Sequence, residues 1–310
     1  MKVFLTKINE SWIVDRVREE FYKNNKEIVT NSIKKADIVW IIAPWMWDKL
    51  DFKKIKNKKI ICSIYHLDTK KLGKEEVNRF NEYDQFVDEY HTISIKSKEQ
   101  IERLTDKPVN QIPFWVNTNK FFYIEDKTSL KKKYNFTPES FLVGSFQRDS
   151  EGSDLTKPKL IKGPDIFLEI VSRLNNEKKN LEVVLTGKRR DYLINNLKNL
   201  GIKYRYFEML KLKNLNELYN LLDLYIVSSR VEGGPQAIVE CATSNTPIIS
   251  SNVGVAQQII SKESIFEVEN VSSFFTAKPN LDYAKKMVYQ YETPQGFDPF
   301  LKMLTDIYES

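Results

Sequence analysis

The feature that most constrains the fold is a repeated succession of short β-branched runs separated by amphipathic stretches of helical period. This pattern is typical of parallel sheets built from βαβ units. The expected strands are residues 2–5, 37–43, 59–65, 90–95 and 109–114 in the first half, and 141–146, 181–187, 203–208, 222–228, 246–251 and 264–269 in the second. Helical patterns separate several of them, notably residues 11–24 and 97–104. The sequence therefore predicts two consecutive α/β units.

Between the two units, residues 117–140 are polar and charged and contain Thr137-Pro138 near their end, which favours a linker with one short helix. We therefore expect an N-terminal domain over residues 1–116 and a C-terminal domain over residues 141–297. Asp298 and Pro299 begin a last amphipathic stretch, residues 298–310, that predicts a terminal helix returning to the first domain.

Composition narrows the class of protein. The two cysteines, Cys62 and Cys241, lie in separate apolar segments, as reduced buried thiols do. The N-terminus lacks the apolar core of a signal peptide, so we expect a cytoplasmic protein. The longest apolar run, residues 38–47, has ten residues and contains Pro44, too few for a membrane-spanning helix.

The formal charge of +6 comes mainly from scattered lysines, which we interpret first as a solvated surface. The alternative is attraction to anionic partners, namely nucleotide phosphates, acidic glycans or the inner face of a membrane. The basic clusters lack the interleaved aromatic residues of single-stranded nucleic-acid grooves, so nucleic acid is not an expected partner.

Ligands of parallel α/β sheets bind beyond the carboxyl ends of the strands, and three such places stand out in the second unit. The strand at 141–146 is followed by "QRDSEGSDLTKPKLIKGPDIFLEI", with Arg148 near the strand and Lys162 before a helix. The other two segments are "GKRR" after residue 186 and "RVEGGPQAIVE" after residue 229. Glycines allow close backbone approach, and helix N-termini with basic side chains attract phosphates.

Glu232 and Glu240 have seven residues between them, a spacing that means little alone. Their context gives it meaning, because Glu232 lies in the Gly-rich turn and Glu240 more than one turn into the following helix. Carboxylates that accept hydrogen bonds from hydroxyls, beside groups that hold phosphates, are what a sugar nucleotide requires. We therefore expect the two carboxylates to line the same side of a pocket.

The run from Glu217 to Ile260 resembles the donor-binding signature of the retaining GT-B glycosyltransferases of family 4 (glycosyl transferases group 1). The segments "HTISIKSKEQIERL…VNQIPFWVNTNKF" and "VGSFQRD…KGPDIFLEIV" resemble the interdomain segment of that family and the start of its donor domain. Together the matches cover about two thirds of the chain. The resemblance implies an α/β GT-B fold, with two Rossmann-like domains facing each other across a cleft.

The resemblance also implies roles for individual residues. Glu232 would bind the transferred sugar, Glu240 the ribose hydroxyls, and Arg148 with Lys162 the diphosphate. Lys157 and Lys159 are alternatives to Lys162, because the loop is longer here than is usual in the family. The donor-binding glycines would be Gly144, Gly233 and Gly234.

Two histidines are candidates for the first domain. His66 follows the strand at 59–65, where the family often places a histidine that contacts the donor sugar, and we include it as a catalytic residue. His91 is interpreted as structural.

The first domain departs from the family pattern. Its first loop, "TKINESW", lacks glycines, and at about 116 residues it is a shortened version of such a domain. Trp40 lies within the second expected strand, and Trp45 and Trp47 follow it. These rings either pack in the core or are offered to an acceptor sugar or a membrane interface.

These features predict a retaining hexosyltransferase that moves a sugar from a nucleotide diphosphate to a hydroxyl of a glycan or lipid-linked acceptor. No metal or other cofactor is expected, because no D-x-D triplet occurs. The alternatives are a nucleotide-sugar epimerase or hydrolase of GT-B fold, and a catalytically silent binding subunit. The sequence leaves open the nucleotide base, the sugar, the acceptor, membrane association and the oligomeric state.

Overall fold

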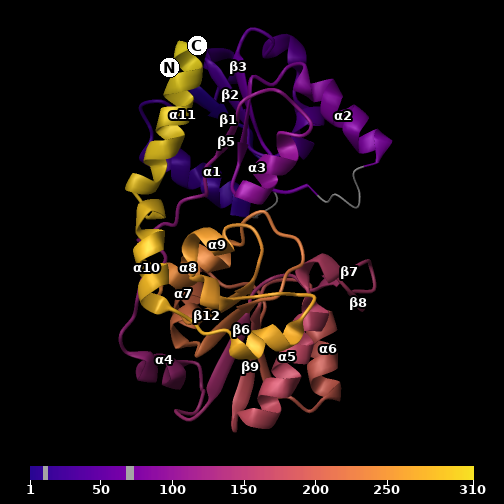
Figure 1. Cartoon of the computed structure of the whole chain (residues 1–310). Coiled ribbons are helices and arrows are strands. Elements are labelled where there is room, and N and C mark those ends of the chain that lie inside the picture. The colour runs from indigo at the N-terminus through magenta and orange to yellow at the C-terminus, as the bar shows by residue number, and fades with distance from the viewer. Residues whose placement is uncertain (10–12, 68–72) are drawn as a thin grey trace. The chain divides into compact units, whose positions relative to one another are not determined.

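The computed structural model describes residues 1–9, 13–67 and 73–310 and divides into two compact units. Residues 1–115 and 293–310 form the first unit, and residues 116–292 form the second. Both are parallel α/β structures, as the sequence predicts (Figure 1).

The first unit contains a five-stranded parallel sheet in the sequential order β1-β2-β3-β4-β5. Its strands are β1 (Val3–Leu5), β2 (Ile38–Ile41), β3 (Lys59–Ser63), β4 (Glu89–Thr92) and β5 (Val109–Gln111). Its α-helices are α1 (Ile13–Asn24), α2 (Lys74–Asp84), α3 (Ile95–Ile101) and α11 (Asp298–Glu309), and its 3₁₀ turns are η1 (Ile33–Lys35), η2 (Pro44–Lys49), η3 (Phe52–Lys54) and η8 (Gln295–Phe297).

Alternation along the strands places aromatic side chains on both faces of the first sheet. Trp40 of β2 contacts Phe21 of α1 and stacks on Phe300 of α11, with ring centroids 5.6 Å apart in both pairs. Tyr90 of β4 points to the opposite face and stacks on Phe80 of α2 at 5.5 Å. The C-terminal helix therefore completes the core of the first unit, and Figure 1 shows it alongside the N-terminal strand.

The second unit contains a six-stranded parallel sheet in the order β10-β9-β6-β11-β12-β13 and a short antiparallel hairpin, β7-β8. Its strands are β6 (Phe141–Ser145), β7 (Ser150–Glu151), β8 (Lys157–Pro158), β9 (Leu181–Thr186), β10 (Tyr204–Phe207), β11 (Leu224–Val227), β12 (Ile248–Ser251) and β13 (Ile265–Phe266). Its α-helices are α4 (Lys127–Lys133), α5 (Pro164–Glu177), α6 (Asp191–Asn199), α7 (Leu212–Leu221), α8 (Gln236–Thr243), α9 (Ala256–Ile259) and α10 (Leu281–Val288). Its 3₁₀ turns are η4 (Leu160–Lys162), η5 (Lys262–Ser264), η6 (Val271–Thr276) and η7 (Tyr289–Tyr291).

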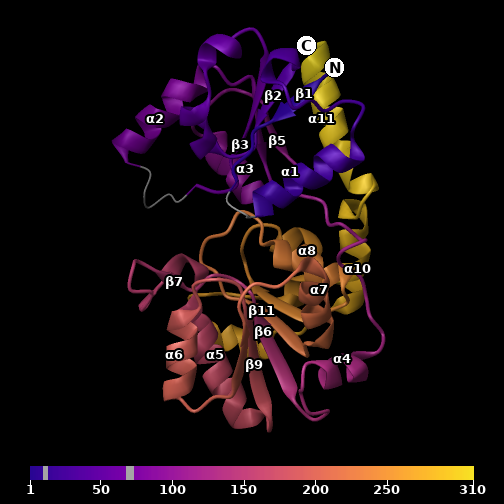
Figure 2. The same ribbon diagram turned by 180° about the vertical axis from the view of Figure 1, so that it is seen from behind.

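Two hydrophobic clusters cover the faces of this second sheet. Helices α5 and α6 pack on one face, and α4, α7, α8, α9 and α10 pack on the other (Figure 2). The residues expected to form a linker include Phe121, Leu130 and Phe136, which are buried in the cluster on the face covered by α4, α7, α8, α9 and α10. Residues 117–140 therefore belong to the body of the second unit, and their short helix is α4.

Several element boundaries differ from the sequence prediction. The strand expected at 90–95 ends at Thr92, because the Ser94 hydroxyl accepts a hydrogen bond from the Ser97 N–H (3.2 Å) and caps α3. Helix α3 consequently begins at Ile95 rather than at residue 97. The expected helix at 11–24 corresponds to α1, and its first residues lie outside the described part of the chain.

Candidate functional site

The strand order of the second sheet defines a topological switch point between β6 and β11. From β6 the chain continues through β9 to β10 on one side, and from β11 it continues through β12 to β13 on the other. Such a reversal leaves a crevice at the carboxyl ends of the two central strands, which is the usual ligand site of open α/β sheets. Arg148 follows β6, and Glu232 follows β11.

Lys162 and Glu232 lie in direct contact at this edge. The Lys162 ammonium donates to Glu232 Oε1, and the side chains are 21% and 14% exposed. Ser229 Oγ lies 3.0 Å from Gln147 Oε1 and 3.4 Å from Glu232 Oε1, so this hydroxyl joins the ends of the two strands. Gln147 Nε2 donates to the Lys162 carbonyl at 2.8 Å. Four polar side chains from the connections after β6 and β11 thus converge beyond these two strands.

Glycine at position 163 holds the Lys162 loop against the end of β11. Its φ of +59° lies in the left-handed region, and a Cβ there would lie 1.8 Å from the Ser228 carbonyl oxygen. Ser228 Oγ donates to the Gly163 carbonyl at 2.8 Å. Pro164 then occupies the first turn of α5, as predicted.

A bidentate ion pair fixes the other side of the turn. Arg230 donates through its two terminal nitrogens to Asp165 at 2.8 and 2.6 Å. Burial raises the pKa of the Asp165 carboxyl, but the hydrogen bonds and charge of Arg230 outweigh it and lower the pKa overall. The turn that carries Glu232 is therefore tied to the N-terminus of α5.

The cationic side chains around this edge influence one another. Burial lowers the pKa of Lys159, and the charges of Arg148 and Lys162 lower it further. Burial also lowers the pKa of Arg148, with a second contribution from Arg189. These four cations come from the loops after β6 and β9, and Glu151 acts on both Arg148 and Lys159, whereas Glu232 acts on Lys159. The excess of positive charge suits an anion with more than one negative charge.

Glu240 is buried in the second unit. Its side chain is on α8, only 4% of the residue is exposed, and Tyr219 of α7 donates its hydroxyl to Oε2 at 2.8 Å. Burial and the Glu240 charge raise the pKa of Tyr219, so this phenol remains a donor. Tyr219 packs on Phe146, whose N–H donates to Tyr225 Oη at 3.0 Å. Glu240 is thus linked to the end of β6 through aromatic residues.

The three predicted donor-binding glycines occupy different environments. Gly144 lies inside β6, where a Cβ would lie 2.3 Å from Leu222 Cδ1, so it allows close packing of the chain. Gly233 and Gly234 form the turn before α8. Gly254, with a φ of +53°, packs against them, since a Cβ there would lie 2.7 Å from the Gly233 carbonyl oxygen. The loop after β12 therefore supports the Gly-rich turn.

His66 and His91 both belong to the first unit. His66 is exposed and follows the carboxyl end of β3, and its proposed contact with a donor sugar stays a prediction. His91 lies inside β4 and is fully buried, with Nε2 donating to the Ile112 carbonyl at 2.8 Å and Nδ1 accepting from Ser63 Oγ at 2.8 Å. Ser63 in turn accepts from Trp40 Nε1 at 2.8 Å. Both ring nitrogens are used within the core, which agrees with a structural role.

Two of the three tryptophans in residues 40–47 are buried in the core of the first unit. Trp40 is fully buried and Trp47 is 8% exposed, whereas Trp45 is 38% exposed. Stacking on an acceptor is therefore an option for Trp45 alone among these three.

Arg190 is a site-edge residue that sequence reasoning did not single out. It is 1% exposed, pairs with the buried Asp149 at 2.7 Å, and donates through Nη1 to the carbonyls of Ser145 (2.8 Å) and Thr186 (3.0 Å). Burial lowers the pKa of Arg190 and raises that of Asp149. This pair fastens the carboxyl ends of β6 and β9 together. The signal available in the sequence was its place just after a strand, in "GKRR".

No group of three or more His, Cys, Asp or Glu side chains within residues 1–9, 13–67 and 73–310 is arranged to hold a metal ion. Over the same residues, no helix is long and apolar enough to span a bilayer.

Comparison with solved structures identifies the class of fold. The chain is similar to HepE of Anabaena, solved in complex with UDP and glucose, with a TM-score of 0.78 at 11% identity over 98% of this chain and 99% of that one. The fold is therefore of the GT-B class, as predicted.

Comparison of sequences supports a glycosyltransferase. Residues 158–277, which include Lys162, Glu232 and Glu240, match the family model of the glycosyl transferases group 1. The O-antigen biosynthesis glycosyltransferase WclY of Escherichia coli is 25% identical over 52% of this chain and 42% of its own length. Protein CapJ of Staphylococcus aureus is 29% identical over 36% of this chain and 29% of its own. Each match thus spans less than half of the curated relative.

Proposed function

We propose that the protein is a retaining glycosyltransferase of family 4, which transfers a hexosyl unit from a UDP-sugar to a hydroxyl of a glycan or lipid-linked acceptor. The observation that carries the proposal is the meeting of Arg148, Lys159, Lys162 and Glu232 at the switch point of the second sheet. The family match, which covers Lys159, Lys162 and Glu232, supports the activity, and the UDP bound to HepE supports the choice of base.

In the proposed reaction the acceptor hydroxyl attacks the anomeric carbon on the face from which the diphosphate leaves. The bond from that carbon to the diphosphate oxygen breaks, the bond to the acceptor oxygen forms, and the acceptor proton passes to the departing phosphate oxygen. Negative charge grows on the diphosphate as it leaves. Arg148 and Lys162, or Lys159 beside them, are suited to stabilise this charge without a metal ion.

Glu232 and Glu240 serve recognition in this proposal. When the donor binds, its phosphates replace Glu232 as the partner of the Lys162 ammonium. Glu232 then accepts hydrogen bonds from hydroxyls of the transferred sugar. Glu240, held by Tyr219, accepts from the ribose hydroxyls. We expect His66 to contact the transferred sugar, as the resemblance to family 4 implies.

A thermal-shift screen with UDP-, GDP- and ADP-sugars tests the donor site, with Glu240→Ala in parallel. We expect UDP-sugars to raise the melting temperature of the wild type and to lose this effect in Glu240→Ala. Acceptor-dependent release of UDP then tests transfer. UDP release that is equal with and without acceptors would favour a hydrolase, and binding without release would favour a silent subunit. A chelator should leave the activity unchanged.

A further inference from the structure

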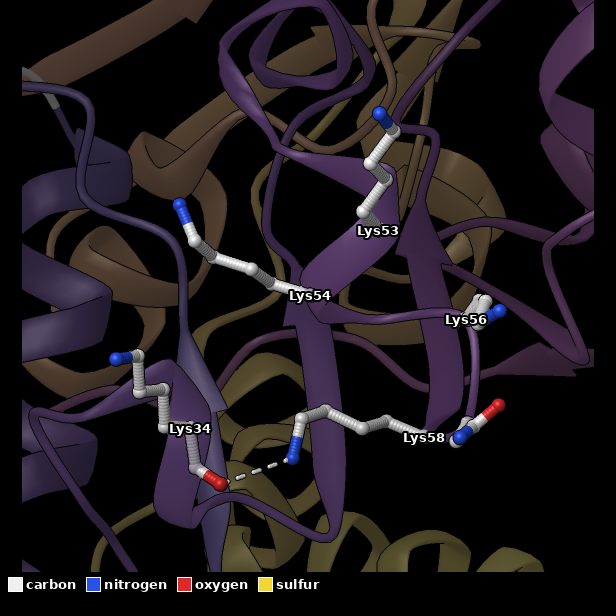
Figure 3. Close-up of a pocket in the computed structure, with 6 residues that line it drawn as sticks. Lys34, Lys53, Lys54, Lys56 and Lys58 are labelled. Carbon is white, nitrogen blue, oxygen red and sulfur yellow. Dashed lines mark hydrogen bonds between the residues drawn. The ribbon is translucent and has the colours of Figure 1, made fainter.

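A cluster of lysines lies at the amino edge of the sheet in the first unit. Lys34 belongs to η1, just before β2, and Lys53, Lys54, Lys56 and Lys58 lie in and after η3, just before β3. With Asn57 they line a shallow hollow of about 260 Å³ (Figure 3). We call these five lysines the lysine patch.

Most of the charge of the lysine patch is not neutralised within the protein. Lys54 pairs with Asp51 at 2.7 Å, and Lys58 donates to the carbonyls of Lys34 and Ala36. In the described part of the chain, the ammonium groups of Lys34, Lys53 and Lys56 make neither a hydrogen bond nor an ion pair. All three residues are exposed, so these charges are available to an anionic partner.

The place of the lysine patch separates it from a substrate site. Parallel sheets bind substrates at the carboxyl ends of their strands, whereas this patch lies at the amino ends of β2 and β3. The carboxyl end of β3 carries His66, at the opposite edge of the same sheet. The patch is thus a surface for docking rather than an extension of the catalytic site.

The chemistry of the patch indicates which partner it fits. Its charges are all ammonium groups, which act as mobile point charges and lack the planar fork of arginine. Among the side chains that the structure describes, those lining the hollow are lysines and one asparagine, and none is an aromatic ring on which a nucleic-acid base could stack. Figure 3 shows the ends of Lys34, Lys53 and Lys56 pointing in different directions, which suits a broad anionic surface better than one small anion.

We propose that the lysine patch docks the protein on a bilayer surface that contains anionic phospholipids. Clusters of four to eight basic residues have this property, and each lysine near such a surface contributes about fivefold in partition. Docking is electrostatic and does not require insertion, so it is sensitive to salt.

Co-sedimentation of the full chain with vesicles tests this proposal. The vesicles contain phosphatidylcholine alone or with phosphatidylglycerol, at low and at high salt. We expect binding to the anionic vesicles at low salt only. The variant K34Q/K53Q/K56Q should bind them about a hundredfold more weakly, since three charges are lost. Equal binding of this variant and the wild type, or wild-type binding to neutral vesicles alone, would overturn the proposal.

A second variant with the same loss of charge controls for net charge. Lys179, Lys198 and Lys203 are exposed lysines of the second unit, so K179Q/K198Q/K203Q should retain vesicle binding within about threefold. Equal weakening of both variants would assign the effect to net charge and overturn the docking site. Wild-type binding to a single-stranded oligonucleotide, with no binding to anionic vesicles, would overturn it in favour of nucleic acid. UDP-induced stabilisation, measured in both variants, tests the donor site independently of this result.

Discussion

At the scale of single residues, Arg148 is the cation whose removal tests the leaving-group site most directly. We expect Arg148→Ala to lower turnover by about a hundredfold or more, since one lost contact to developing charge costs about 2.7 to 4 kcal/mol. Steady-state kinetics with a UDP-sugar measures this effect. Arg173→Ala on α5 is the control, because Arg173 pairs with Glu169 and lies over the Phe275 ring. Nearly unchanged turnover in Arg148→Ala would remove Arg148 from the site.

The contact between Lys162 and Glu232 leads to a second prediction, on the binding of free UDP. Glu232 neutralises Lys162 in the ligand-free protein, so a phosphate must compete with this carboxylate. We expect Glu232→Gln to bind UDP about fivefold more tightly, because a partly buried ion pair of this kind is worth about 1 kcal/mol. Calorimetric titration measures the affinity, and Glu169→Gln is the matched control. Weaker UDP binding by Glu232→Gln would show that Glu232 supports the phosphate site.

Buried His91 makes the stability of the first unit depend on pH. Burial lowers its pKa to about 4, whereas the unfolded chain has the ordinary value near 6.5. Below pH 6.5 the unfolded state therefore binds more protons, and the folded state loses stability until the pH reaches about 4. We expect a loss of about 1.4 kcal/mol from this residue between pH 7.5 and 5.5.

Urea denaturation at the two pH values, followed by tryptophan fluorescence, measures this loss. His91→Gln provides the comparison, because its amide replaces the imidazole and does not titrate. A pH dependence that is the same in His91→Gln and the wild type would contradict the assignment to His91.

At the scale of elements, the loop before α5 and the end of β11 depend on one glycine. Gly163→Ala combines a left-handed φ with a Cβ only 1.8 Å from the Ser228 carbonyl oxygen, so the loop must move. We expect destabilisation of about 3 kcal/mol or more, together with loss of UDP binding.

Gly201 allows the free-energy cost of a left-handed φ to be separated from the cost of the steric clash. Its φ is +64°, but a Cβ there would meet no atom within 4 Å. Gly201→Ala should therefore cost only about 1 kcal/mol, and it should leave UDP binding unchanged. Chemical denaturation of both variants makes the comparison, and equal costs would exclude a close-approach role for Gly163.

The sequence predicted most strands because each is a β-branched run between polar segments, as in β3 and β9. It did not single out α2, whose segment is largely charged and buries only Phe80 and Tyr83. The hairpin β7-β8 was also missed, since strands of two residues leave no period to recognise.

The candidate site was predictable to the extent that its residues follow strands. Arg148, Lys162 and Glu232 were found by this rule and by the resemblance to family 4. Tyr219 was not, because it lies on α7 and reaches Glu240 only through the packing of two helices. Burial of Glu240 likewise depends on tertiary packing that a glutamate in a sequence does not reveal.

At the scale of the whole molecule, α11 is required for the core of the first unit although it is last in the chain. Phe300 is fully buried and contacts Trp40, Phe114 and Trp115. We expect Phe300→Ala to destabilise the first unit by about 3 to 5 kcal/mol. Tyr308→Ala on the same helix should have little effect, because Tyr308 is 47% exposed.

Tryptophan fluorescence isolates the unfolding of the first unit, because all five tryptophans lie within residues 1–115. The fluorescence transition of Phe300→Ala should shift to lower denaturant, with that of Tyr308→Ala close to the wild type. Coincident transitions for both variants and the wild type would show that α11 contributes little.

The return of the last helix to the first unit also determines the order in which the chain can fold during synthesis. The ribosome releases all of residues 116–292 before it releases Phe300, so the second unit can complete its core while the first still lacks one helix. Until Phe297 and Phe300 have been synthesised, Phe21, Trp40 and Trp115 in the first 115 residues lack these aromatic partners. The half of the protein that is made first is therefore the half that is finished last.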